Sequence, residues 1–137
     1  MKLKYRQLSS PAPFSERQKL FRPIIPVSLR SNTQSLRFEA LIDSGADFSI
    51  FPLGIAKRLT INLPKLQKIY FSSATGNIVE GLISKITLDI GDGDFATNIV
   101  FADLPGNVGI LGQYGFFEEF IINFNHKKKE IELNRRR

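Results

Sequence analysis

The chain has 137 residues, of which 42% are hydrophobic and 23% are charged, and its formal net charge is +6. This length suits one domain, and the absence of cysteine excludes a disulfide framework and thiolate metal ligands. No apolar run approaches the roughly 18 residues of a membrane-spanning helix, and residues 1–10 lack the apolar segment of a secretory signal. We therefore expect a cytoplasmic protein without a membrane span.

The excess of positive charge lies mainly at the two ends of the sequence. Lys2, Lys4 and Arg6 lie at one end, Lys127–Lys129 and Arg135–Arg137 lie at the other, and the middle is nearly balanced. A nucleic-acid-binding β-domain would also be basic, and it would bind in a salt-sensitive way through these ends. We instead expect solvated ends and a hairpin tip, without a nucleic-acid partner.

Residues 1–22 show no sustained periodicity and contain two of the seven prolines. They predict a mobile lead-in with a short helical turn around Ser15–Leu20. The sequence from residue 23 to residue 134 is expected to form the domain, and residues 135–137 are expected to form a basic tail.

The first hairpin is predicted from alternation in Pro26–Arg30 and Leu36–Ile42, on either side of a polar turn. Its second strand leads directly into Asp43. A short helix is expected to begin at Pro52, because the apolar residues that follow it have helical spacing.

The rest of the sequence alternates between short apolar segments and turns. Strands are expected over residues 65–73, 78–90, 95–102, 120–124 and 130–133, with a tight turn at 75–77. A second short helix is expected near Tyr114–Glu119. Many short strands separated by close turns indicate an all-β, barrel-like domain with one or two small helices.

The stretch from Phe38 to Pro52 contains the parts of a carboxylate active site. Hydrolysis of a peptide bond by carboxylates needs two of them close enough to share a proton, so that one activates water and the other protonates the carbonyl. An apolar strand delivers Asp43, the Ser44 hydroxyl can brace the loop, and Gly45 permits close approach of a substrate backbone. Asp-Ser-Gly alone is common in ordinary turns, but here Ile110-Leu111-Gly112 follows about 65 residues later, with a glycine-bearing hairpin between.

The chain resembles the retropepsin-like aspartic proteases, the family of retroviral proteases and their prokaryotic relatives. The resemblance rests on three motifs in order: Leu41–Asp47, the candidate flap Ser73–Ile78, and Ile110–Gly112. It covers roughly residues 23–134, and it implies a closed β-barrel with a flap hairpin, acting as a homodimer.

The resemblance also implies roles for individual residues. Asp43 would be the catalytic aspartate, Ser44 would form hydrogen bonds beneath the active site, and Gly45 would bind the substrate backbone. The other expected substrate-binding residues are Ala46, Asp47, Ile50, Ile110 and the flap tip Thr75, Gly76, Asn77 and Ile78. Leu111 and Gly112 would support the loop that carries Asp43. The reaction would need neither a metal nor a cofactor.

The sequence contains one Asp-Ser-Gly, and one such motif in one domain supplies only one of two carboxylates. A two-fold symmetric homodimer would supply the second, and the resemblance indicates that terminal segments contribute to its interface. Gln113 stands where retroviral enzymes commonly have Arg, so the usual ion pair with Asp47 is not expected, although the Gln113 amide could still form a hydrogen bond.

Other candidate functional groups are weaker. Asp89, Asp92 and Asp94 miss the spacing of a calcium loop and are expected to form a strand turn. His126 lies beside three lysines and is expected in a solvated loop. The main alternative function is a catalytically inactive module with the same fold, used for dimerisation or peptide binding.

Overall fold

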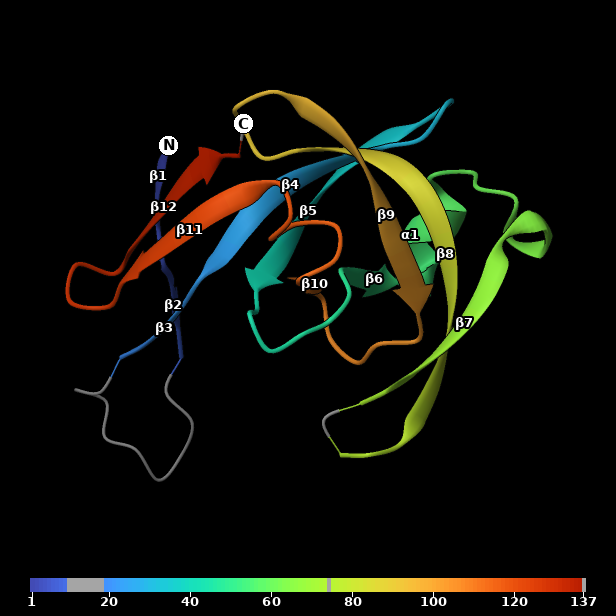
Figure 1. Cartoon of the computed structure of the whole chain (residues 1–137), viewed down its shortest axis with the longest axis horizontal. Coiled ribbons are helices and arrows are strands. Elements are labelled where there is room, and N and C mark those ends of the chain that lie inside the picture. The colour runs from blue at the N-terminus through green and yellow to red at the C-terminus, as the bar shows by residue number, and fades with distance from the viewer. Residues whose placement is uncertain (10–18, 74, 137) are drawn as a thin grey trace.

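A computed structural model describes residues 1–9, 19–73 and 75–136 of the chain (Figure 1). Within these ranges the fold is all-β with one short α-helix, which confirms the expected fold class. The strands are β1 (Lys2–Lys4), β2 (Arg6–Leu8), β3 (Leu20–Arg22), β4 (Ile24–Arg30), β5 (Ser35–Ile42), β6 (Ile50–Pro52), β7 (Gln67–Ser72), β8 (Ile78–Asp89), β9 (Asp94–Ala102), β10 (Gly109–Leu111), β11 (Phe120–Asn125) and β12 (Glu130–Arg135).

The main sheet has the strand order β4-β5-β10-β6-β9-β8-β7, and β8 also pairs with β4. The pairings therefore form a ring, which runs from β4 through β5, β10, β6, β9 and β8 back to β4. The strands β4, β8, β9 and β10 direct alternate apolar side chains inward, and those of Leu29, Leu88, Ile99, Phe101 and Leu111 are almost completely buried. Their burial contributes to the hydrophobic stabilisation of this sheet.

The helix α1 (Leu53–Arg58) follows Pro52, as the sequence predicts. Proline suits the entry to a helix because its missing N–H would have had no partner in the first turn. Ile55 and Ala56 are buried against the sheet, and Leu59 closes the helix by donating its N–H to the carbonyl of Ile55 at 2.9 Å. A 3₁₀ turn, η1 (Leu63–Lys65), comes before β7. In the part of the chain that the structure describes, no helix is long and apolar enough to cross a membrane.

The described part of the expected mobile lead-in, residues 1–22, contains three short strands. The strand β1 pairs with β12, where Leu3 lies opposite Ile131, and β2 pairs with β3. The expected helical turn at Ser15–Leu20 falls mostly outside the described residues, and its last residue begins β3. These strands are only three residues long, which is too short for an alternating pattern to predict them. The strand β1 also depends on a partner far along the chain.

The second helix, expected near Tyr114–Glu119, is replaced by consecutive turns. Gly115 has a φ of +96°, and a Cβ at this position would lie 2.8 Å from the carbonyl oxygen of Asn98. The Thr97 hydroxyl also donates a hydrogen bond to the Gly115 carbonyl at 2.9 Å. A backbone held in the left-handed region by β9 cannot continue an α-helix.

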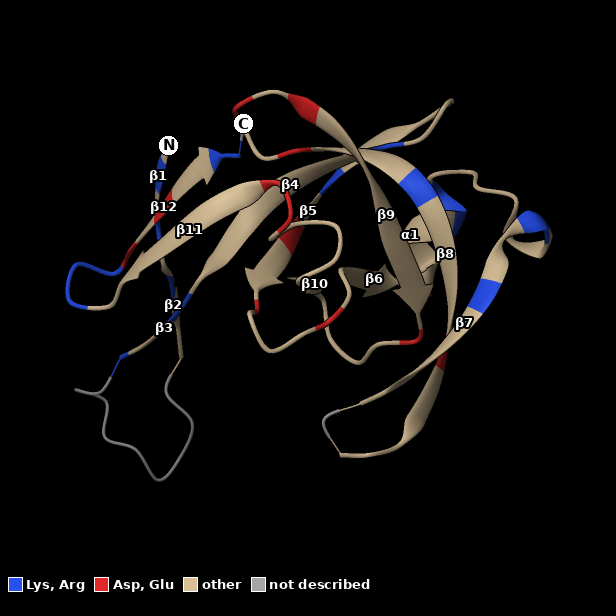
Figure 2. Cartoon of the chain, viewed as in Figure 1, with Lys and Arg blue, Asp and Glu red and all other residues tan. Residues whose placement is uncertain are grey.

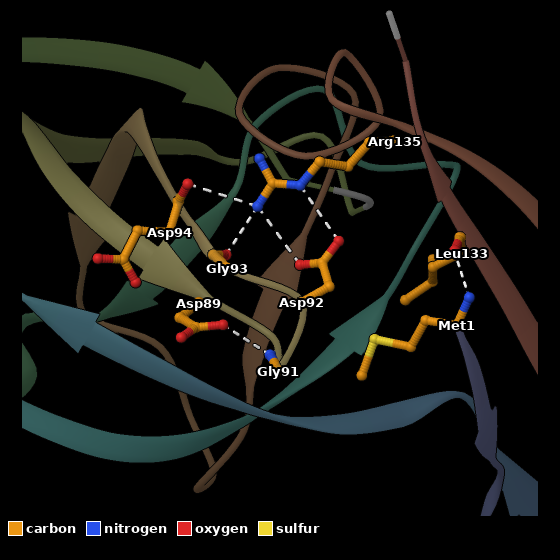
Figure 3. A network of polar contacts seen from close by, with 8 residues as sticks. All are labelled: Met1, Asp89, Gly91, Asp92, Gly93, Asp94, Leu133 and Arg135. Carbon is orange, nitrogen blue, oxygen red and sulfur yellow. Dashed lines mark hydrogen bonds and ion pairs between the residues drawn. The ribbon is translucent and has the colours of Figure 1, made fainter.

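The turn between β8 and β9 is held by its own aspartates and by Arg135 at the end of β12 (Figure 3). The Arg135 guanidinium donates to the Asp92 carboxylate and to the carbonyl of Gly93 at 2.7 Å, and it lies over the Phe95 ring. Asp89 accepts a 2.7 Å hydrogen bond from the Gly91 N–H, which lowers the pKa of its carboxyl group. The three aspartates thus form a strand turn, as expected.

Asp89 is expected to make folding sensitive to acid. Because its pKa is lower in the folded state, its contribution is present above the unfolded pKa of about 3.9 and is lost as pH falls through the folded value. Asp89→Asn keeps an acceptor oxygen but does not titrate. Urea unfolding at pH 7 and pH 3 should show a smaller loss of stability in this variant than in the wild type. An unchanged loss would exclude Asp89 as a contributor.

Candidate active site

Asp43 lies directly after the buried end of β5, where the strand meets β10. Ile42 pairs with Leu111 in the parallel ladder, and the Asp43 N–H donates to the Leu111 carbonyl at 3.0 Å. Ala40 and Ile42 are buried in the core. The backbone of Asp43 is therefore fixed by a core strand, while its half-buried side chain reaches the surface.

The loop after Asp43 folds back on the carboxylate. The Gly45 N–H donates to Asp43 Oδ1 at 2.9 Å, and the Ala46 N–H donates to the Asp43 carbonyl at 3.2 Å. A Cβ on Gly45 would lie 3.3 Å from the same Oδ1 atom, so glycine leaves the carboxylate uncrowded. Within the described residues, neither Asp43 nor Asp47 forms an ion pair.

The segment after β10 holds this loop from the other side. The N–H groups of Gln113 and Tyr114 donate to the carbonyls of Ala46 and Asp47, both at 2.8 Å. The Gln113 side chain donates from Nε2 to the Ser44 carbonyl at 2.8 Å. The Gln113 amide therefore holds the loop by a hydrogen bond to its backbone, where an ion pair with Asp47 was not expected.

Ser49 is a buried polar residue that the sequence analysis missed. Its side chain is almost fully buried, its hydroxyl donates to the Tyr114 carbonyl at 2.9 Å, and it accepts a hydrogen bond from the Gly112 N–H at 3.0 Å. The hydroxyl therefore joins the segment before β6 to the segment after β10. A single serine between apolar neighbours gave no sequence signal of this role.

Ser49→Ala is expected to reduce the free energy of unfolding by about 1–3 kcal/mol, because it leaves the buried Gly112 N–H without an acceptor. Urea unfolding measures this loss. Ser35→Ala is the matched control, since Ser35 is exposed at the start of β5, and it should change stability little. Equal effects of the two substitutions would contradict a bridging role for Ser49.

A cavity of about 390 Å³ opens beside Asp43. It contains two carboxylates and no basic side chain, and most of the remaining lining is apolar. The lining residues are Asp43, Gly45, Ala46, Asp47, Phe48, Ile50, Phe71, Ser72, Ser73, Val79, Leu104 and Ile110. Figure 2 shows the acidic residues of the loop between β5 and β6, on a molecule whose basic residues lie elsewhere.

A larger cavity of about 830 Å³ lies between the β4–β5 turn, the segment after α1 and β8. Its lining has no carboxylate, and its charged groups are Arg30 and Lys85. Since hydrolysis by carboxylates needs an acidic group at the bound peptide, the smaller cavity is the better candidate site.

The structure brings together six of the residues that the sequence predicts for the site: Asp43, Gly45, Ala46, Asp47, Ile50 and Ile110. Ser44 is exposed next to Asp43, and Leu111 and Gly112 lie buried behind the loop. Thr75, Gly76, Asn77 and Ile78 lie in the turn and at the start of β8, outside the cavity lining. Ala74, which also belongs to the candidate flap, lies outside the described residues.

The hairpin of β7 and β8 reaches the cavity through residues next to its turn. Phe71, Ser72, Ser73 and Val79 line the cavity, whereas Ile78 is 75% exposed. The turn itself is closed by hydrogen bonds between Ser73 and Asn77 and between Gly76 and Ser73. In Figure 1 this hairpin extends away from the body of the sheet.

Four apolar lining residues were missed: Phe48, Phe71, Val79 and Leu104. The rings of Phe48 and Phe71 pack in a tilted arrangement with their centroids 5.8 Å apart, so an aromatic contact joins the loop of Asp43 to the hairpin. The alternation of β7 and β8 could have marked Phe71 and Val79 as facing one side. Leu104 lies in an irregular loop, where no sequence pattern identifies it.

No metal centre is indicated. Among the residues that the structure describes, no three histidine, cysteine, aspartate or glutamate side chains are grouped to hold a metal ion. His126 is exposed in the turn after β11, as the sequence predicts.

The fold is similar to that of EIAV protease complexed with the inhibitor HBY-793, with a TM-score of 0.54 and 27% sequence identity. The match covers 67% of this chain and 82% of that chain. No family model and no curated protein matches the sequence. The chain therefore has a retropepsin-like fold.

Proposed function

We propose that this chain is an aspartic endopeptidase that acts as a homodimer, with one Asp43 from each subunit. Two carboxylates close enough to share a proton cannot both ionise easily, so one would act as base towards water while the other protonates the peptide carbonyl. Water would be the nucleophile, and the reaction would need no metal or cofactor. Peptides and proteins would be the substrates.

The position of Asp43 carries this proposal. Its backbone is fixed by β10, its carboxylate is held by Gly45, and it lies at the edge of a largely apolar cavity in a retropepsin-like fold. Such a cavity suits a peptide side chain beside the scissile bond. In this proposal Ser44 braces the pair of loops, Asp47 binds the peptide backbone, and Thr75–Ile78 form the flap tip.

The competing proposal is an inactive module of the same fold that binds peptides or only dimerises. That function gives no chemical reason for the position of Asp43 at the cavity, where it forms no ion pair with any of the described residues. Incubation with a diverse peptide mixture at several pH values, followed by mass spectrometry, separates the two functions. Cuts made by the wild type and absent with Asp43→Asn would support the protease. No cuts by a folded, dimeric wild type at any pH would support the binding module.

A further inference from the structure

The cavity of about 830 Å³ shares no lining residue with the cavity beside Asp43. Its walls are the β4–β5 turn, the segment that follows α1, and the strands β8 and β9. The Ser31 hydroxyl joins two of these walls, because it donates a hydrogen bond to the Leu59 carbonyl at 2.7 Å. The cavity is therefore separate from the candidate active site, and its walls are held together by the fold.

The strand β8 has an open stretch of main chain in this cavity. One edge of β8 pairs with β9 along Gly81–Asp89. The other edge pairs with β7 as far as Ile83 and with β4 from Thr87 onward. In the part of the chain that the structure describes, no backbone group on this second side bonds to residues 84–86. These three residues line the cavity, so their backbone on this side can pair with an extended segment that enters it.

The charge of the cavity favours an acidic segment. Its charged residues are Arg30 and Lys85, and none of the described carboxylates lines it. Arg30 forms an ion pair with Asp94, whereas Lys85 is exposed and forms no ion pair with any described residue. Most of the other lining side chains carry a hydroxyl or an amide group, which can donate hydrogen bonds to a carboxylate. The described lining has no aromatic side chain on which a nucleic-acid base could stack, so a peptide is favoured over a nucleic acid.

Thr60 belongs to this lining and has a strained backbone. Its φ is +58°, a left-handed value that is rare for a β-branched residue. The Thr60 N–H donates to the Lys57 carbonyl at 3.0 Å and the Ile61 N–H donates to the Ala56 carbonyl at 3.1 Å, which is the pattern of a helix end that usually has glycine. Glycine would adopt this φ without strain, so the helix end alone does not account for threonine. Contact of the threonine side chain with a ligand in the cavity would account for it.

We propose that this cavity binds an acidic segment of another protein or peptide in an extended conformation. The segment pairs its backbone with residues 84–86 of β8, its carboxylates interact with Lys85 and Arg30, and Thr60 contacts it from the segment after α1. The proposal goes beyond the proposed proteolysis and does not depend on it, because no residue of the Asp43 cavity takes part.

The test is fluorescence anisotropy of a dye-labelled octapeptide of alternating glutamate and valine, titrated with the full chain. The protein carries Asp43→Asn, so that the result does not depend on cleavage. The glutamate peptide is expected to bind, and the same peptide with glutamine in place of glutamate should bind about tenfold more weakly or worse, because its carboxylates are lost. The glutamate peptide with N-methyl groups on its backbone cannot donate hydrogen bonds to β8, and its affinity should fall by a similar factor of about ten.

A charge reversal tests the role of Lys85. Lys85→Glu should weaken binding of the glutamate peptide by about tenfold or more, because like charges then face each other. Lys128→Glu is the matched control, since Lys128 is exposed in the turn after β11 and its substitution makes the same change in net charge. The control should weaken binding by no more than about twofold, because exposed charges far from the peptide are screened by salt.

Thr60→Gly separates a binding role from a structural one. It should raise the midpoint of urea unfolding, because glycine removes the backbone strain, and it should weaken peptide binding by about threefold or more. A Thr60→Gly protein that binds as tightly as its parent would overturn the proposal.

The remaining outcomes are equally decisive. The proposal would be overturned if the glutamate peptide did not bind, if its glutamine or N-methylated form bound equally well, or if Lys85→Glu had no larger effect than Lys128→Glu. Tighter binding of an oligothymidylate of the same length would assign the cavity to nucleic acid and would also overturn it. Peptide cleavage by the wild type is a separate measurement, so failure of the proposed protease would leave this binding result unchanged.

Discussion

Asp43→Asn is expected to reduce the rate constant of peptide cleavage by about 10³-fold or more, because each proton transfer in the reaction needs a carboxyl group at this position. An amide neither accepts a proton from water nor donates one to the carbonyl. The variant should remain folded, since the loop is held mainly by backbone groups and Asn retains an oxygen that accepts the Gly45 N–H. The measurement is the initial rate on a peptide that the wild type cuts.

Asp94→Asn is the matched control for this loss. Asp94 forms an exposed ion pair with Arg30 at the turn between β8 and β9, and exposed ion pairs contribute little to stability. The control should therefore keep the wild-type rate. Full activity of a folded Asp43→Asn protein would rule out the proposed mechanism.

Mixing wild-type and Asp43→Asn subunits provides a stricter test of the shared site. If each active site needs Asp43 from both subunits, an equal mixture that has exchanged subunits should keep only about a quarter of its dimers with two aspartates. At equal total protein, the activity should fall to that fraction of the wild-type value. A fall to one half would show that each subunit works alone.

Gly112→Ala is expected to destabilise the fold by about 3 kcal/mol. A Cβ at Gly112 would collide with the Phe48 carbonyl and would lie 2.7 Å from the Ala46 carbonyl oxygen. Both oxygens belong to backbone that is held between β5, β6 and β10, so neither can move away cheaply. The loop that carries Asp43 would shift, and cleavage should fall together with stability.

The control for this substitution is Gly54→Ala. Gly54 lies in α1, and a Cβ there meets no atom within 4 Å. Alanine should maintain stability or raise it by up to about 1 kcal/mol, because it favours the helix. Urea unfolding of both variants measures the difference. If Gly112→Ala were as stable as Gly54→Ala, the close packing behind the Asp43 loop would not be needed for the stability of the fold.

The sequence predicted most of the strands because their side chains alternate between core and solvent. Pro26–Arg30 and Leu36–Ile42 alternate, and they lie within β4 and β5. The same argument placed the strands of the last hairpin. The position of Asp43 at the end of an apolar strand was also readable, since a strand and the loop that follows it are local features.

Local sequence patterns did not predict the secondary structure where contacts with distant segments determine the backbone conformation. The strand β1 forms because Leu3 packs beside Ile131 across the sheet, and the turns at Tyr114–Glu119 form because Gly115 is held against β9. Neither contact has a signal within a window of ten residues. In the same way, Leu104 and Phe48 become lining residues only when the fold brings their segments to one cavity.

The sequence by itself determined the all-β class, the strand that carries Asp43 and the single Asp-Ser-Gly motif, because each of these depends on neighbours along the chain. The tertiary structure decided which side chains surround that aspartate and how Ser49 and Gly112 fix its loop. These features depend on contacts between residues far apart in sequence, which appear only once the strands are placed side by side.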